Sequence, residues 1–127
     1  MEVKKSMASY IKFSLTSELK EKQNHILDKI RKLGKIKVGS NEVTKAIERG
    51  NAKLVLIAED VNPPEIVMHL PLLCDEKSIP YSYGYSKKEL GEKAGINTGT
   101  SAIVVVNEGE SKKELDDLAK KIQSLKK

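Results

Sequence analysis

The stretch Gly34–Gly50, with the sequence GKIKVGSNEVTKAIERG, predicts a short strand, a tight turn and a helix in immediate succession. Polar and apolar residues alternate over 35–38, as they do in a strand with one buried face. Gly39 supplies the backbone freedom that the turn needs, and Ser40 or Asn41 can cap the free N–H groups at the start of the helix. Gly50 then ends the helix.

The predicted helix has a packing face and a polar face. Val43, Ala46 and Ile47 follow the i, i+3, i+4 spacing that seats a helix on a core. The polar side chains of the first turns and the outer face are therefore not needed for packing, and they begin at the positive end of the helix dipole. These side chains are Asn41, Glu42, Lys45 and Arg49.

An amide, a carboxylate and an ammonium group in this arrangement can read the edge of a nucleic-acid base. Lys45 can donate to guanine O6 or N7, and Glu42 can accept from amino and imino protons, which a phosphate does not offer. The alternative is that Asn41 is a cap, Glu42 complements the dipole, and Lys45 and Arg49 are solvated. Composition alone favours this alternative, because caps and acids in the first turn are common.

Four blocks of sequence, in a fixed order, carry a family resemblance. The run 39–46, GSNEVTKA, looks like a signature of the form G-[TS]-N-E-x-T-K-A. The other blocks are 58–61 (AEDV), 69–74 (HLPLLC) and 86–91 (SKKELG), the last of which continues into 94–96 (AGI). From about Tyr10 to its end, the chain resembles the archaeal kink-turn-binding ribosomal proteins of the L-seven-A-e family.

The resemblance implies recognition of the kink-turn, an RNA helix that bends sharply at a short bulge followed by tandem sheared G·A pairs. It places Asn41, Glu42 and Lys45 against the edges of the sheared guanines. The implied contacts to backbone phosphates come from Lys37, Arg49 and Lys87. The implied loop around the flipped bulge nucleotide consists of Asn62, Ile66, Ile96, Asn97 and Thr98.

The resemblance also implies partners. Archaeal members of the family serve the large ribosomal subunit, box C/D and H/ACA guide particles, and ribonuclease P. The implied partners of this chain are therefore structured RNAs that contain a kink-turn or kink-loop and the protein components of guide particles. Such a protein binds and bends RNA without making or breaking a bond, so no cofactor and no small-molecule substrate are expected.

Length and composition predict one RNA-binding domain over residues 1–127, with a flexible segment at 1–9. Hydrophobic residues make up 39% of the chain and charged residues 32%, which is typical of a soluble globular protein. No apolar run approaches the roughly 20 residues that cross a bilayer. The first residues contain no apolar core of a signal peptide, so the expected location is the cytoplasm.

The positive charge is concentrated at the front of the chain. The first 50 residues contain 12 Lys or Arg and 6 Asp or Glu, a net charge of +6, whereas the whole chain carries +5. This distribution favours a polyanion that meets one side of the protein. Aromatic residues make up only 4% of the chain, which argues against a sheet that stacks several single-stranded bases.

No metal or catalytic constellation is evident. Cys74 lies in an apolar stretch and is predicted to be a core residue, and His25 and His69 have no zinc-like spacing with it. Glu59 and Asp60 follow a predicted strand, where we interpret them as polar support for neighbouring loops. An enzyme built on Glu59, Asp60 and His69 would lack a nucleophile. The remaining alternative is a protein-interaction module of the same fold that does not bind RNA.

Alternating helices and strands predict an α/β fold, and the resemblance specifies a three-layer α-β-α sandwich with a small central mixed sheet. Outside the opening stretch, the expected elements are a helix from Thr16 or Ser17 to Leu33, a buried strand at Lys53–Ala58, a helical segment after Asn62, a strand at Ile79–Tyr83, a helix from Ser86 to Ala94, a strand at Ala102–Val106 and a covering helix after Ser111.

Several helix starts are predicted from local patterns. Asn62 is expected to be a cap with Pro63 at the first helical position, and Pro71 is expected to divide the segment into two pieces or to kink it. Glu65 is expected to return the capping hydrogen bond to Asn62, and further capping boxes are expected at Ser86–Glu89 and Ser111–Glu114. The core face of the segment after Asn62 is predicted to contain Ile66, Val67, Leu70, Leu73 and Cys74.

Overall fold

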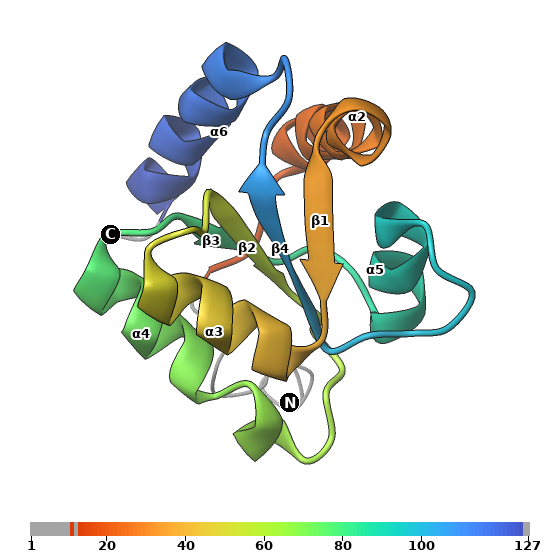
Figure 1. Cartoon of the computed structure of the whole chain (residues 1–127), viewed down its shortest axis with the longest axis vertical. Helices are drawn as coiled ribbons and strands as arrows, with labels where there is room; N and C mark the ends of the chain where they lie inside the picture. The colour runs from red at the N-terminus through yellow and green to blue at the C-terminus, as the bar shows by residue number, and fades with distance from the viewer. Residues whose placement is uncertain (1–10, 12, 126–127) are drawn as a thin grey trace.

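A small mixed sheet lies between two layers of helices (Figure 1). The computed structural model describes Ile11 and residues 13–125, so the predicted flexible segment 1–9 lies outside the described residues. The four strands follow the order β1 (Lys35–Val38), β4 (Ala102–Asn107), β2 (Leu54–Ile57) and β3 (Tyr81–Ser82). Strand β4 is antiparallel to both of its neighbours, whereas β2 and β3 are parallel. The predicted α/β sandwich with a mixed sheet is confirmed.

The helices form the two outer layers. Helices α3 (Ser40–Arg49) and α4 (His69–Lys77) contact each other on one face of the sheet. On the other face, α2 (Ser17–Leu33) contacts both α5 (Lys87–Ala94) and α6 (Lys112–Leu125). A short 3-10 helix, η1 (Pro64–Ile66), precedes α4. Among the described residues, we find no helix with the length and apolar content that a bilayer crossing requires.

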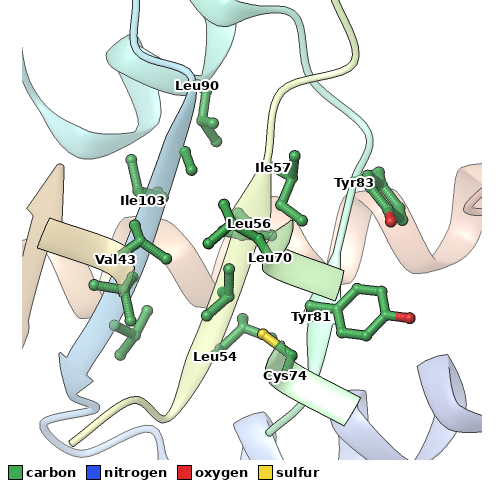
Figure 2. Close-up of a cluster of buried hydrophobic side chains, with 14 of the residues drawn as sticks. Val43, Leu54, Leu56, Ile57, Leu70, Cys74, Tyr81, Tyr83, Leu90 and Ile103 are labelled. Carbon is green, nitrogen blue, oxygen red and sulfur yellow. The ribbon is translucent and has the colours of Figure 1, made fainter. Parts of the chain in front are cut away.

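The core is centred on the two inner strands. All four residues of β2 are buried, as the absence of alternation in this segment predicts. In Figure 2, the ribbon of α2 passes behind the strands, whereas Val43 of α3 and Leu70 and Cys74 of α4 approach from the opposite side. Cys74 is fully buried, which confirms its prediction as a core residue. Burial also raises the pKa of Tyr81 on β3 to about 12.

The start of α3 differs from the prediction. Neither Ser40 nor Asn41 caps the helix, because Gly39 occupies the cap position and no side chain accepts a capping hydrogen bond. Gly39 has a φ of 98°, which favours glycine, and its N–H donates to the carbonyl of Ala102 at 2.9 Å. This bond to β4 fixes where the chain turns into α3. The amide of Asn41 is therefore not used as a cap.

The segment after β2 also differs from the prediction. Pro63, not Asn62, occupies the cap position of η1, and no side chain caps this helix. Ile66 was predicted to face the core but is 41% exposed. Two helical pieces are present as predicted, although the break precedes α4, and Pro71 lies in its first turn, where a missing N–H costs little.

Of the three predicted capping boxes, only the one at Ser86–Glu89 is confirmed, because no side chain caps η1 after Asn62. The hydroxyl of Ser86 accepts from the N–H of Glu89 at 3.2 Å, and the Glu89 carboxylate accepts from the N–H of Ser86 at 3.0 Å. The box at Ser111 is wrong, because the Ser111 hydroxyl is buried and finds no hydrogen-bond partner among the described residues. Glu114 instead pairs with Lys29 at 2.7 Å, and this hydrogen bond holds the pKa of Glu114 below its usual value.

Candidate nucleic-acid interface

Three backbone hydrogen bonds gather the predicted site at one end of the sheet. The N–H of Gly39 donates to the carbonyl of Ala102, and the N–H of Ala58 donates to the carbonyl of Ser101, both at 2.9 Å. The N–H of Thr100 donates to the carbonyl of Lys87 at 3.1 Å. The turn before α3, the end of β2, the loop before β4 and the start of α5 are therefore neighbours, at the lower end of the sheet in Figure 1.

The first turns of α3 present the three predicted base-reading residues. Asn41 is exposed, and the Lys45 Nζ lies 3.7 Å from the Glu42 Oε2. The side chains of Lys45 and Glu42 are 55% and 45% exposed. An exposed pair of this kind contributes at most about 1 kcal/mol, so both groups can exchange this contact for a ligand at little cost.

A hollow of about 410 Å³, the basic hollow, runs beside α3. Its charged lining consists of five cations and one carboxylate, and uncharged residues complete it. The lining residues are Lys35, Lys37, Glu42, Lys45, Ala46, Arg49, Gly50, Asn51, Lys53, Val106 and Asn107. Because one sign of charge dominates a concave surface, the basic hollow attracts anions.

The structure brings four of the predicted residues together in this hollow. Lys37 of β1 shares it with Glu42, Lys45 and Arg49 of α3. The sequence interpretation missed two further cations of the lining, Lys35 and Lys53. Alternation along β1 could have revealed the first, because Lys35 and Lys37 lie on the same face of the strand.

The loop before β4 is a separate part of the site. Ile96 is half-buried, and its N–H donates to the carbonyl of Gly91 on α5 at 3.0 Å. Asn97 and Thr98 are exposed. The loop packs so closely on α5 that a Cβ at Gly91 would lie 2.0 Å from the carbonyl oxygen of Thr98. The loop is therefore held against α5 by its backbone, while its polar side chains remain accessible.

Lys87, Asn62 and Ile66 lie outside the described lining of the basic hollow. Lys87 is exposed in the first turn of α5, beside the loop before β4. Asn62 and Ile66 are exposed on the connection between β2 and α4. The predicted site thus consists of the basic hollow with Asn41, the loop on α5, and the connection that follows β2.

Glu59 and Asp60 support the neighbouring loops, as predicted. Glu59 Oε2 accepts from the N–H of Gly84 at 3.0 Å, and Asp60 Oδ1 accepts from the N–H of Lys87 at 2.8 Å. These bonds fix the start of α5. Within the part of the chain that is described, no group of three or more His, Cys, Asp or Glu could hold a metal ion.

His69 has a structural contact of its own. Its Nε2 lies 2.8 Å from the hydroxyl of Thr44, which also lies 2.8 Å from the carbonyl oxygen of Ser40. This contact joins α4 to the first turns of α3. Glu59, Asp60 and His69, which were weighed as an enzyme site, are therefore engaged with different elements.

Comparisons with known proteins agree with this description. Residues 21–115 match the Ribosomal protein L7Ae/L30e/S12e/Gadd45 family. The structure is similar to that of the Giardia lamblia 15.5kD RNA binding protein, with a TM-score of 0.83 and 30% sequence identity over 94% of this chain and 99% of that chain. The matched family is one of ribosomal proteins and the similar structure is an RNA-binding protein, so neither is an enzyme, as predicted for this chain. Because the family match covers most of its length, the chain belongs to the Ribosomal protein L7Ae/L30e/S12e/Gadd45 family.

Proposed function

We propose that this protein binds kink-turn RNA and stabilises its bent form. The observation that carries the proposal is the position of Glu42, the one carboxylate in the described lining of a hollow with five cations. A site for phosphate alone gains nothing from a carboxylate, whereas a carboxylate can accept from the amino and imino protons of guanine. Membership of a family with an RNA-binding relative supports the proposal.

Asn41, Glu42 and Lys45 are the proposed base-reading residues. All three lie in the first two turns of α3, and none is used as a helix cap. Side chains cannot reach base edges in the deep, narrow major groove of a regular A-form helix. A sharp bend widens that groove, and the proposed ligand is therefore the pair of sheared guanines that the bend exposes.

Lys37, Arg49 and Lys87 are the proposed backbone contacts. Lys37 and Arg49 line the basic hollow, and Lys87 extends the basic surface to the start of α5. Phosphate contacts of this kind provide salt-dependent affinity and set the register, whereas the base contacts select the sequence. The exposed segments with Asn62 and Ile66, and with Ile96, Asn97 and Thr98, are the proposed enclosure of the flipped bulge nucleotide.

The proposed mechanism is a shift of the RNA population toward the bent conformer. A protein that contacts only the bent RNA stabilises it by the difference in affinity for the two forms. The energy of bending is then offset by contacts that the bend permits. No covalent step and no cofactor enter this mechanism.

Ribonucleoprotein assembly is the proposed setting for this binding. The RNA partners would be those of the large ribosomal subunit, the box C/D and H/ACA guide particles, and ribonuclease P, with the cytoplasm as the location. Exposed apolar side chains on η1, on α4 and at the residue before α4 are suited to contact a protein component of such a particle. Ile66 and Met68 are each 41% exposed, and Leu72 is 65% exposed.

These apolar side chains also favour the second candidate function, a protein-interaction module that does not bind RNA. A gel-shift titration separates the two functions. It compares a kink-turn RNA with a control in which the tandem G·A pairs are changed to Watson–Crick pairs. We expect clearly tighter binding of the kink-turn. Equal affinity for the two RNAs would overturn the kink-turn proposal, and no binding to either would favour the protein-interaction module.

Lys87→Ala is expected to reduce the salt dependence of kink-turn binding. Each phosphate neutralised by a cation contributes about one unit to the slope of log K against log salt, so the slope should flatten by about one unit. The measurement is the dissociation constant over a series of salt concentrations. The matched control is Lys113→Ala, an exposed lysine on α6 in the helix layer on the other face of the sheet from α3, which should leave the slope unchanged. Equal slopes for Lys87→Ala and the wild type would exclude this phosphate contact.

A further inference from the structure

The basic hollow continues well beyond the proposed base-reading residues. It begins beside Glu42 in the first turn of α3 and reaches Gly50 at the end of that helix. The ten residues of α3 give the helix a length of about 15 Å. Base reading at Glu42 and Lys45 therefore occupies only the beginning of the hollow, and Arg49 is the one residue of its far end among the proposed RNA contacts.

Sheet topology places two cations at this far end. Lys35 pairs with Asn107 in the register between β1 and β4, and the N–H of Lys53 donates to the carbonyl of Val105 at 2.7 Å. Since β4 lies between β1 and β2, Lys35 and Lys53 flank its end from opposite sides. Two strand spacings separate their backbones by about 10 Å. Arg49, from the last turn of α3, lines the same space.

The chemistry of the far end suits an anion with several charges. Lys35, Arg49 and Lys53 are exposed, and none of them forms an ion pair within the described residues. The oxygen Oδ1 of Asn107 accepts from the N–H of Gly109 at 2.8 Å, so the amide of Asn107 has its N–H donors to offer a ligand. A row of cations and amide donors matches a phosphate backbone, which carries acceptors only.

We infer that the far end of the basic hollow, with Lys35 and Lys53 as its cations, binds the phosphate backbone of the duplex stem next to the kink. This inference rests on the proposed function, which places the kink at Glu42, and the basic hollow continues from there to Gly50 at the end of α3. The stem contact is independent of sequence. It adds affinity and fixes the direction in which that stem leaves the protein, while the selection of G·A pairs stays with the first turns of α3.

The test combines a double variant with RNAs of different stem length. Lys35→Gln/Lys53→Gln removes two charges from exposed positions, and the control Lys113→Gln/Lys120→Gln removes two from the exposed face of α6. For a kink-turn with two long stems, we expect the salt slope of the first variant to flatten by about two units relative to the wild type. The control should keep the wild-type slope. Both variants should still prefer the kink-turn to the Watson–Crick control RNA.

Truncating the two RNA stems one at a time identifies the stem that contacts Lys35 and Lys53. Shortening one particular stem should flatten the wild-type slope by the same two units and leave the slope of Lys35→Gln/Lys53→Gln unchanged. The inference is overturned if this variant keeps the wild-type slope, or if its slope falls equally with long and short stems. If the proposed function is wrong, the result is distinguishable, because the wild type itself then binds the kink-turn RNA and the Watson–Crick control RNA with equal affinity.

Discussion

Replacing Glu42 with alanine is expected to weaken kink-turn binding by about 1–3 kcal/mol, roughly 5- to 150-fold, while leaving the salt slope nearly unchanged. The expected direction of this change in affinity distinguishes base contact from phosphate attraction. Glu42 is the carboxylate in the described lining of a strongly basic hollow, so its removal would raise affinity for RNA if phosphate attraction were the whole interaction. A loss of affinity requires that the carboxylate accepts hydrogen bonds from a base. The measurement is the dissociation constant of kink-turn RNA at several salt concentrations.

Glu48→Ala is the matched control for this variant. Glu48 is an exposed acid on the same helix, but it lies in the last turns and outside the described lining of the basic hollow. Glu48→Ala removes the same charge as Glu42→Ala, so it should leave the affinity for kink-turn RNA unchanged or raise it slightly. Comparable losses in Glu42→Ala and Glu48→Ala would contradict the proposed base contact, as would a gain of affinity in Glu42→Ala.

The second large effect is expected for Gly91→Ala on α5. Alanine is favoured over glycine within a helix by about 1 kcal/mol, so helix propensity alone predicts a more stable protein. The added Cβ, however, would lie 2.0 Å from the carbonyl oxygen of Thr98 and 3.3 Å from the Cα of Gly99. Because these are backbone atoms, the loop must move. We expect a net loss of about 1–3 kcal/mol in the free energy of unfolding, measured by chemical denaturation.

The same variant tests the role of the loop in binding. Since Asn97 and Thr98 move with the displaced backbone, Gly91→Ala should weaken kink-turn binding as well as stability. Glu92→Ala, at the next and exposed position of α5, serves as the control for both measurements and should change neither much. Gly91→Ala with wild-type stability would disprove the tight packing of the loop on α5. Wild-type affinity with reduced stability would remove the loop from the binding site.

Periodic patterns in the sequence predicted the elements that matter most for the site. The apolar spacing of Val43, Ala46 and Ile47 placed α3 with its polar face outward, and all three side chains are buried. The unbroken apolar run at 54–57 predicted a strand covered on both faces. Such signals depend on long stretches of burial, so a single tertiary contact does not change them.

Capping patterns were less reliable because tertiary contacts decide where a helix begins. Ser40 and Asn41 are good caps by type, but the bond from Gly39 to Ala102 places the start of α3 one residue earlier. Ser111 is followed three residues later by a glutamate, but Glu114 pairs with Lys29, which is far away in the sequence. A local pattern contains no information about either competing partner.

The basic hollow could not be predicted from the sequence for a related reason. Lys35 and Lys53 become neighbours of Arg49 only because β4, from the end of the chain, inserts between β1 and β2. The front of the chain is basic by composition, but strand order determines which of its cations share one surface. The residues of α3 were predictable because a single helix positions them.

Base reading by Glu42 is tested by a double-mutant cycle between Glu42 and one sheared guanine of the kink-turn. Replacing that guanine with inosine removes the amino group that a carboxylate could accept from. If Glu42 reads this guanine, inosine should weaken binding of the wild type more than binding of Glu42→Ala, with a coupling energy of about 0.5–3 kcal/mol. An equal effect of inosine on both proteins, at each of the sheared guanines, would show that Glu42 accepts from none of their amino groups and would contradict the proposed base contact.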